Sequence, residues 1–270
     1  MKNIVFIVLA ITGIILTGNS CQREQEWSSL FNGQDLSNWD MFLGSSLGPD
    51  FDSLAQAATI EEVFSVVEME GDNVIRISGE INGSLATPES FENYHLRLEF
   101  KWGDKVYSRR NSGLLYHSFG DFGAAFGTWM PNIEFQMMHQ NLGDTYLMVN
   151  TTCETEVIYV EDTGQFVYTP GADALIFGEH ANGRMIRKGQ DNENPLGEWN
   201  TIELYTFGRT AVHVVNGTTV MVNNNTGVYE NGIINPLVSG KIQIQSEGAE
   251  LFIRSIEIKP ITGLPHEILP

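Results

Sequence analysis

Hydrophobic and polar residues alternate over many short stretches of this chain. Within residues 94–102, for example, Tyr94 and Leu96 lie on one face, whereas His95 and Arg97 lie on the opposite face. A period of two residues is the period of a β-strand. Similar stretches predict strands at residues 74–77, 94–102, 112–118, 133–138, 200–207, 211–215, 240–245 and 250–259.

Glycine, asparagine and aspartate separate these stretches, as is typical of turns. Asn216-Gly217 lies between residues 211–215 and 218–222 and predicts a two-residue hairpin turn, because both central positions of such a turn favour positive φ. Only residues 53–64 have a helical rhythm. Many short strands with little helix predict an all-β fold, namely a sandwich or jelly roll of two antiparallel sheets.

Two long segments interrupt the strand pattern. Residues 118–131 are rich in glycine and aromatic side chains, and residues 177–198 are rich in glycine, asparagine and charge without any period. Loops of this length usually serve a site. We therefore expect residues 177–198 to form a mobile flap beside the site, with a plain surface loop as the alternative.

The N-terminus resembles an export signal. A lysine is followed by an apolar run from Ile4 to Leu16, which is too short to span a bilayer, and by small and polar residues up to Cys21. This pattern predicts a signal peptide over residues 1–20. The residues before Cys21 resemble a bacterial lipobox, so Cys21 is expected to be acylated and to anchor the chain to a membrane. Ordinary cleavage, with Cys21 incidental, is the alternative.

The mature chain is long enough for one domain with a substantial core. We expect a tether at residues 21–28, a single β-sandwich at residues 29–262 and a tail at residues 263–270. The predicted location is the outer membrane or the periplasm. With Cys21 acylated, Cys153 has no partner for an intramolecular disulfide, and it is expected to be a small buried hydrophobic residue.

The formal net charge of −19 narrows the range of partners. Such a surface repels nucleic acid and anionic lipid, whereas a neutral sugar needs no charge match. The sequence contains no Walker loop, dinucleotide fingerprint or His-Glu-x-x-His motif. Phosphoryl transfer and hydride transfer are therefore not supported.

The strongest candidate for chemistry is the segment Ile133-Glu134-Phe135-Gln136. In a strand, Glu134 and Gln136 point to one face, and a carboxylate beside an amide is common on a sugar-binding surface. Trp129, shortly before them, can supply a flat apolar surface for a pyranose ring. The alternative for any single polar residue here is that it is polar only because it lies on the solvent-exposed outer face of the sheet.

The strand preceding this segment adds further polar candidates. Arg109, Asn111 and His117 lie near Glu134 if the two strands pair. Such a set can remove a proton next to a carbonyl group, with one base and donors to the enolate oxygen. A divalent ion held through Glu134, His117 or His139 is a second option.

Several sequence blocks then resemble one protein family. Trp27 to Trp39 contains the opening pattern Leu-Phe-Asn-Gly-x-Asp-Leu-x-x-Trp of that family. Further blocks match in order at Asn111-Ser112-Gly113, Glu134-Phe135-Gln136, Gly143-Asp144-Thr145-Tyr146, Gly197-Glu198-Trp199-Asn200, Val214-Val215-Asn216-Gly217 and residues 240–250. The chain resembles the 3-keto-disaccharide hydrolase family, also described as 3-keto-glucoside-1,2-lyase and 3-keto-2-hydroxy-glucal hydratase, over residues 27–261. Glu247 stands where many members carry histidine.

The resemblance implies a concanavalin A-like jelly roll with its site on the concave sheet. It also implies substrates that are glycosides oxidised at C3, cleaved by proton abstraction at C2, elimination at C1 and hydration. Glu134 is the expected base, with His117 and Arg109 as further catalytic candidates. The expected substrate-binding residues are Asn111, Gln136, Trp129, His139, Asp144, Tyr146, Gln245 and Glu247.

Two other functions remain open at this point. A sandwich of this kind also hosts non-catalytic glycan-binding modules. A direct glycoside hydrolase would need a second carboxylate opposite Glu134, for which the sequence offers Glu99 or Asp144.

Overall fold

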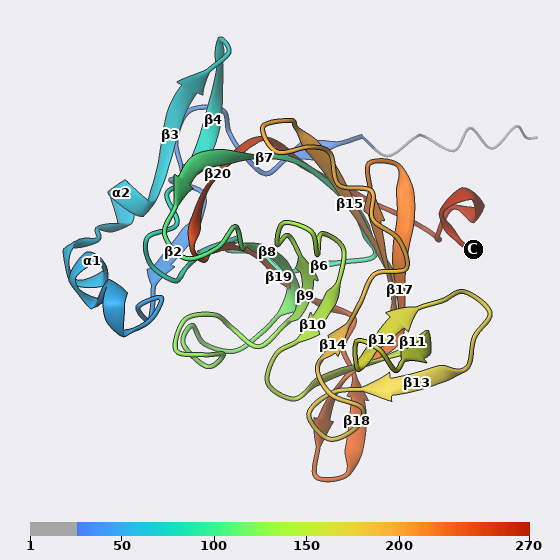
Figure 1. Cartoon of the computed structure of the whole chain (residues 1–270). Helices are drawn as coiled ribbons and strands as arrows, with labels where there is room; N and C mark the ends of the chain where they lie inside the picture. Colours follow the sequence, from blue (N-terminus) through green and yellow to red (C-terminus); the bar gives the residue numbers. More distant parts are fainter. Residues whose placement is uncertain (1–25) are drawn as a thin grey trace, which may run out of the picture.

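The computed structural model describes residues 26–270. The predicted signal peptide, Cys21 and the first part of the predicted tether lie outside the described residues. Within residues 26–270 the chain forms two antiparallel β-sheets that pack face to face, which confirms the predicted all-β jelly roll. In Figure 1 the larger sheet curves over the smaller one.

Twenty strands are divided between the two sheets of the described chain. The larger sheet contains β1 (Ser28–Ser29), β3 (Phe64–Met69), β4 (Asp72–Ile77), β7 (Tyr94–Val106), β11 (Thr151–Val160), β12 (Gln165–Tyr168), β13 (Ala174–Phe177), β15 (Asn200–Phe207), β16 (Thr210–Val215), β17 (Thr218–Glu230), β18 (Ile233–Pro236) and β20 (Ala249–Pro260). The smaller sheet contains β2 (Asp40–Leu43), β5 (Gly83–Ala86), β6 (Phe91–Glu92), β8 (Gly113–Ser118), β9 (Ile133–Gln136), β10 (Thr145–Leu147), β14 (Met185–Ile186) and β19 (Ser239–Ser246).

The order of strands in the smaller sheet is the part of the topology that builds the site. From one edge to the other it is β14-β10-β9-β8-β19-β5-β2, with β6 paired to β19. Strands that are distant in sequence, such as β8 and β19, are therefore direct neighbours. The main path of the larger sheet is β12-β11-β17-β16-β15-β7-β20-β4-β3.

The hydrophobic core lies between the two sheets. Leu96, Leu98 and Phe100 of β7 are buried there against residues such as Leu114 and Phe135 of the smaller sheet. These are the apolar positions of the predicted alternation, and their burial is the main source of stability. The polar face of β7 lies on the outside of the larger sheet.

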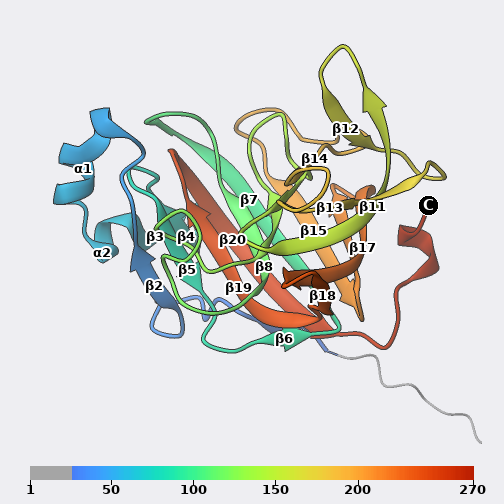
Figure 2. The same ribbon diagram turned by 90° about the horizontal axis from the view of Figure 1, so that it is seen from below.

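The predicted helical segment forms two short helices instead of one. These are α1 (Asp52–Ala57) and α2 (Ile60–Val63), following a 3-10 turn at Pro49–Phe51. The chain is extended at Ala58 and Thr59, and the Thr59 side chain accepts a hydrogen bond from the Glu62 backbone N–H at the start of α2. Figure 2 shows the two helices at one end of the molecule and the C-terminal segment at the other.

Both ends of the described chain pack onto the larger sheet. Ser28 pairs with Ile258, and the Trp27 ring lies 4.8 Å from the Arg97 guanidinium. The last residues of the predicted tether are thus part of the domain. The predicted tail contains a 3-10 turn at His266–Ile268, and Thr219 donates a 2.7 Å hydrogen bond to the Ile268 carbonyl.

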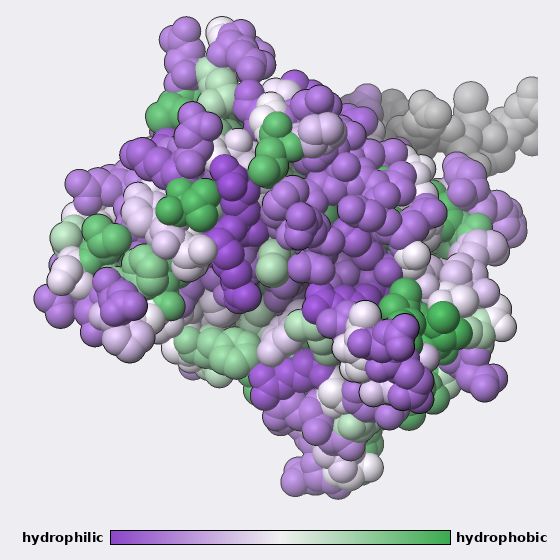
Figure 3. Space-filling model, viewed as in Figure 1, coloured by the Kyte–Doolittle hydropathy of each residue, from purple (hydrophilic) through white to green (hydrophobic). Residues whose placement is uncertain are grey.

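The burial of Cys153 and the hydropathy of the surface agree with the sequence. Cys153 is buried, and its burial raises the pKa of the thiol to about 12, as expected for a structural residue without nucleophilic reactivity. The molecular face in Figure 3 is mostly hydrophilic. None of the helices between residues 26 and 270 is long and apolar enough to cross a membrane.

Candidate active site

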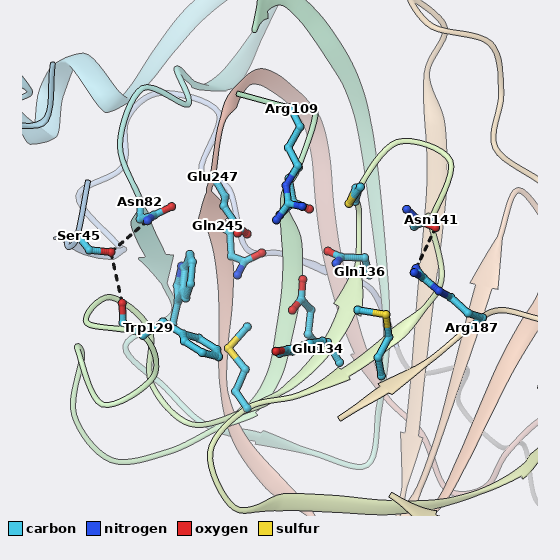
Figure 4. A pocket seen from close by; sticks show the side chains of 16 residues that line it. Ser45, Asn82, Arg109, Trp129, Glu134, Gln136, Asn141, Arg187, Gln245 and Glu247 are labelled. Atoms are coloured by element: carbon cyan, nitrogen blue, oxygen red, sulfur yellow. Dashed lines mark hydrogen bonds between the residues drawn. The ribbon is translucent and has the colours of Figure 1, made fainter. Parts of the chain in front are cut away.

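A cavity of about 430 Å³ opens on the smaller sheet, on the face that points away from the core. This volume is typical of small-molecule sites, which hold about 300–1,000 Å³. Figure 4 shows the side chains around it. The cavity is lined by Ser45, Asn82, Arg109, Asn111, Phe126, Trp129, Glu134, Gln136, Met138, Asn141, Tyr146, Met148, Met185, Arg187, Gln245 and Glu247.

Strand register places the polar residues of the cavity floor in two rows. In the first row, Tyr146 of β10 pairs with Glu134 of β9, and Glu134 pairs with Leu115 of β8. In the second row, Gln136 of β9 pairs with Gly113 of β8. Because side chains two residues apart point to the same face, both rows face the cavity.

Gly113 leaves the room that the floor needs. A Cβ atom at this position would lie 2.4 Å from Glu134 Oε1 and 2.5 Å from Gln245 Oε1. The side chains of Glu134 and Gln245 therefore both extend over the glycine from the two neighbouring strands. This approach explains why the block Asn111-Ser112-Gly113 ends in glycine.

Two amides of the cavity lie near its two carboxylates. The Gln136 side-chain nitrogen, placed toward its acceptors, donates to Glu134 Oε1 at 2.6 Å and to Asn111 Oδ1 at 3.2 Å. Asn111 lines the same cavity as Glu247 and lowers the pKa of its carboxyl group. Gln136 thus links Glu134 to Asn111 on the floor of the cavity.

Burial shifts the pKa of both carboxyl groups upward. Glu134 is 3% exposed, and burial, followed by the negative charges of Glu247 and Asp144, raises its pKa well above 4.5, against the opposing effect of Arg109. Burial also raises the pKa of Glu247 to about 7, with Arg109 and Asn111 acting in the opposite direction. Carboxyl groups with raised pKa values are candidates for proton exchange with a substrate.

Most of the predicted site residues meet in this one cavity. Those that line it are Arg109, Asn111, Trp129, Glu134, Gln136, Tyr146, Gln245 and Glu247. They come from five segments of the chain, and strand pairing brings these segments together. The site lies on the outer face of the smaller sheet.

Trp129 lines the cavity but has a different role from the predicted one. It is only 4% exposed, and its Nε1 donates a 2.9 Å hydrogen bond to the Gly83 carbonyl. It packs with Leu115 and Met148 in a small cluster on the outer face of the sheet. Trp129 therefore anchors the aromatic loop, and the more exposed ring at the cavity is that of Phe126.

The prediction that His117 belongs to the site is wrong. Strand alternation would place it beside Leu115, but a bulge opposite Ile242 shifts the register, and His117 has a positive φ of 51°. Its ring is buried near Tyr94 and Tyr116, outside the cavity lining. Burial lowers the pKa of His117 to about 4.

His139 and Asp144 lie behind the cavity wall and do not line it. His139 Nδ1 lies 2.9 Å from Glu193 Oε1, in a contact with the long loop. The buried Asp144 accepts a 2.6 Å hydrogen bond from Arg187, and burial raises the pKa of its carboxyl group. The structure thus does not bring His139 and Asp144 into the cavity as predicted; His139 contacts the long loop, and Asp144 contacts Arg187, which does line the cavity.

Sequence reasoning missed several residues of the cavity. They are Ser45, Asn82, Phe126, Met138, Asn141, Met148, Met185 and Arg187. Met185 and Arg187 belong to the predicted flap, which is therefore beside the site as expected and contains the short strand β14. Whether the flap is mobile stays a prediction.

The residues predicted to bind a divalent ion do not come together. His117 is buried in the core and His139 contacts Glu193, so neither joins Glu134. Among residues 26–270, no three His, Cys, Asp or Glu side chains are grouped closely enough to hold a metal ion. A histidine-containing ion site therefore does not fit these residues.

Neither predicted second carboxylate for direct hydrolysis faces Glu134 across the cavity. Glu99 belongs to β7 of the larger sheet, where its oxygens lie 3.0 Å from Arg254 nitrogens, and Asp144 is bound to Arg187. The second carboxylate of the cavity is Glu247.

Comparison with solved structures finds several β-sandwich proteins. A candidate glycosyl hydrolase from Parabacteroides distasonis is 19% identical, with 87% of this chain and 94% of that chain covered at a TM-score of 0.49. Carbohydrate-binding module CBM66 from Bacillus subtilis is 7% identical, with 82% and 97% covered at a TM-score of 0.42. A comparison with curated proteins finds no match.

The sequence itself matches a known family over nearly the whole described chain. The sequence profile of the 3-keto-alpha-glucoside-1,2-lyase-like domain matches residues 26–259. This range agrees with the resemblance seen in the ordered sequence blocks. The chain belongs to the 3-keto-alpha-glucoside-1,2-lyase-like domain family.

Proposed function

We propose that this protein is a carbohydrate-active enzyme that cleaves 3-keto-glycosides by elimination and hydration. The family supports a carbohydrate-active role. The observation that carries the proposal is the buried Glu134 at the floor of a sugar-sized cavity, hydrogen-bonded to Gln136 and close to Gln245. A single base beside neutral amides suits a substrate whose reacting proton is already acidic.

The chemistry needs only modest catalytic groups. A ketone at C3 acidifies the hydrogen on C2, so a carboxylate can remove that proton while the C–H electrons form an enolate at C3. The enolate then restores the C3 ketone and expels the substituent at C1. The oxygen of this substituent takes up a proton as the C1–O bond breaks. Water adds at C1 and a proton returns to C2, which gives the free 3-keto sugar and a released alcohol.

The residues of the cavity can be assigned to these steps. Glu134 is the base at C2, and its raised pKa makes it a stronger base than an exposed carboxylate. Glu247, whose pKa is about 7, is protonated in a large fraction of molecules at neutral pH and delivers the proton to the leaving oxygen. Arg109 and the amides of Asn111 and Gln136 hold the sugar and the developing enolate oxygen.

Direct glycoside hydrolysis is the second candidate, and one observation favours it. Glu134 and Glu247 line the same cavity, and two carboxyl groups are what a glycoside hydrolase uses. A non-catalytic glycan-binding module would have no need for two buried carboxyl groups with raised pKa values, because ionising them in the protein interior is costly.

The deciding experiment follows hydrogen at C2. The protein is incubated in D₂O with methyl 3-keto-glucoside and with unoxidised methyl glucoside, each with and without a chelator, and products are followed by NMR. Elimination and hydration place deuterium at C2 of the product faster than free 3-keto-glucose exchanges alone. Cleavage of both glucosides without deuterium at C2 would indicate direct hydrolysis, and binding without turnover would indicate a lectin-like module.

We further propose that the protein is an exported lipoprotein, with the oxidised sugar as its ligand and the membrane as its anchor. The support is the signal-like sequence and the lipobox-like residues before Cys21. Ser28 pairs with β20, so the anchored segment would join the larger sheet, which lies on the opposite side of the core from the cavity.

A further inference from the structure

Much of the cavity wall is built from hydrophobic side chains. Six of its lining residues are aromatic rings or methionines, namely Phe126, Trp129, Met138, Tyr146, Met148 and Met185. Met185 is 40% exposed and Phe126 is 52% exposed, so both side chains are accessible to a ligand in the cavity. Methionine is flexible and makes favourable contacts with aromatic rings.

The hydrophobic side lies directly beside the proposed base. Tyr146 is the strand partner of Glu134, and Met185 is the next partner of Tyr146 in the same row. Neighbouring strands are about 4.8 Å apart, so these residues lie about one and two strand spacings from Glu134. Gln245 belongs to β19, on the opposite side of Glu134 in the same sheet. We call the part of the cavity at β19, with Gln245, its polar half, and the part formed by Tyr146, Met185 and the Phe126 ring, with Arg187 at its edge, its apolar half.

Phe126 is held at the cavity in a strained backbone conformation. Its φ is +52°, in the left-handed region that bulky residues rarely adopt. Short-range contacts keep the loop in place, including hydrogen bonds between Ala125 and Trp129 and a 3.3 Å hydrogen bond from Ser45 to the Phe126 carbonyl. The Arg184 guanidinium lies 5.5 Å from the ring centre. A strained, exposed aromatic residue at a cavity suggests a functional role.

The charged group beside this half is already paired within the protein. Arg187 Nη1 donates to Asp144 at 2.6 Å and to Asn141 at 3.0 Å. Figure 4 shows the pair Arg187–Asn141 at one end of the cavity and the pair Asn82–Ser45 at the other. A second sugar ring placed against Phe126 and Met185 would set hydroxyl groups against apolar side chains, where hydroxyl groups without partners are costly.

The polar half of the cavity contains a free hydrogen-bond acceptor. Gln245 Oε1 is buried and has no hydrogen-bond partner within residues 26–270, and it lies near Glu134 over Gly113. A sugar hydroxyl can donate to this free acceptor. The sugar thus fits the polar half of the cavity, and a group without hydroxyls fits the apolar half.

We propose that the substrate carries an aromatic aglycone, which binds between Phe126 and Met185 while the oxidised sugar lies over Glu134. This inference rests on the proposed function and specifies its substrate class: 3-keto-glycosides of aromatic alcohols rather than 3-keto-disaccharides. Phe126 and Met185 determine the specificity and take no part in the chemistry. The aglycone gains contact with rings and thioether groups without losing any hydrogen bond.

The kinetic test compares three 3-keto-glucosides of one anomeric form whose leaving groups are ordinary alcohols. The aglycones are benzyl alcohol, methanol and a second glucose. We expect the benzyl compound to have the highest kcat/KM. In Phe126→Ala and Met185→Ala, KM for the benzyl compound should rise about three- to tenfold, in line with the free energy of an aromatic contact, whereas the methyl compound stays within about twofold. Phe207→Ala, an exposed phenylalanine outside the cavity, is the matched control.

Each outcome decides between the two proposals. A higher kcat/KM for the glucosyl compound, or equal effects of both variants on all three compounds, would overturn the aromatic aglycone while leaving the elimination reaction in place. Absence of turnover for all three would overturn the proposed function. Calorimetry with the unoxidised benzyl, methyl and glucosyl glucosides then still tests the apolar half: tighter benzyl binding that is lost in Phe126→Ala supports it, and tighter glucosyl binding overturns it.

Discussion

Replacing Glu134 by glutamine removes the proposed base with almost no change in shape. The new amide has the size of the carboxylate, so it fits above Gly113, and its oxygen can still accept from Gln136. A buried ionisable group is replaced by a neutral one, so the stability of the fold should not decrease. Loss of a general base costs about 10²- to 10⁴-fold in rate, or about 3–5 kcal/mol of transition-state free energy.

The effect of Glu134→Gln should appear in kcat, because the amide still binds the sugar and KM changes little. The assay measures kcat and KM on methyl 3-keto-glucoside, and a thermal unfolding curve shows that the variant is folded. Glu99→Gln is the matched control, since Glu99 pairs with Arg254 on the other sheet and its loss should leave kcat unchanged. Near-normal turnover in Glu134→Gln would refute the reasoning and make Glu247 the next candidate for the base.

Three further predictions follow from the same geometry and from the sequence. As pH rises through about 7, Glu247 loses its proton, so kcat for a substrate with a poor leaving group should fall. In Glu247→Gln, most of kcat and this decrease of kcat at high pH should both be lost. Gly113→Ala should reduce kcat at least tenfold while the protein still unfolds cooperatively, because the new Cβ would displace Glu134. Limited proteolysis should cut first within residues 177–198, and ligand should protect them; a cut unaffected by ligand would favour a plain surface loop.

The fold could be predicted because burial imposes a simple period on the sequence. Leu96, Leu98 and Phe100 alternate with polar residues, and each of them faces the core. The hydrophobic pattern also predicts the helical segment, but it does not predict that the segment is divided into two helices. The extended backbone at Ala58 depends on local conformation and not on that pattern.

The site could be predicted only in part. Glu134 and Gln136 are found from alternation, because they share a face opposite Phe135. His117 follows the same rule and was misplaced, since one extra residue in β8 opposite β19 turns its side chain into the core. A bulge is not visible in the hydrophobic pattern when the residues around it are compatible with either face.

The residues that were missed show a second limit. Met185 and Arg187 occur in a segment without any period, and only the pairing of β14 with β10 brings them beside Glu134. Methionine in such a segment gives no chemical signal by itself. Its meaning comes from its neighbours in space, which in this chain are Tyr146 and the exposed ring of Phe126.

Glu247 gives the cavity a second carboxyl group, which suits an elimination reaction. This chain places a second carboxyl group, that of Glu247, in the same cavity as Glu134. The negative charge of Glu247 contributes to the raised pKa of Glu134, as expected for two carboxyl groups in one cavity. Elimination needs one group that accepts a proton and one that gives a proton. Glu134 and Glu247 line one cavity together with the amides of Asn111 and Gln136, so the pair can serve both halves of the reaction.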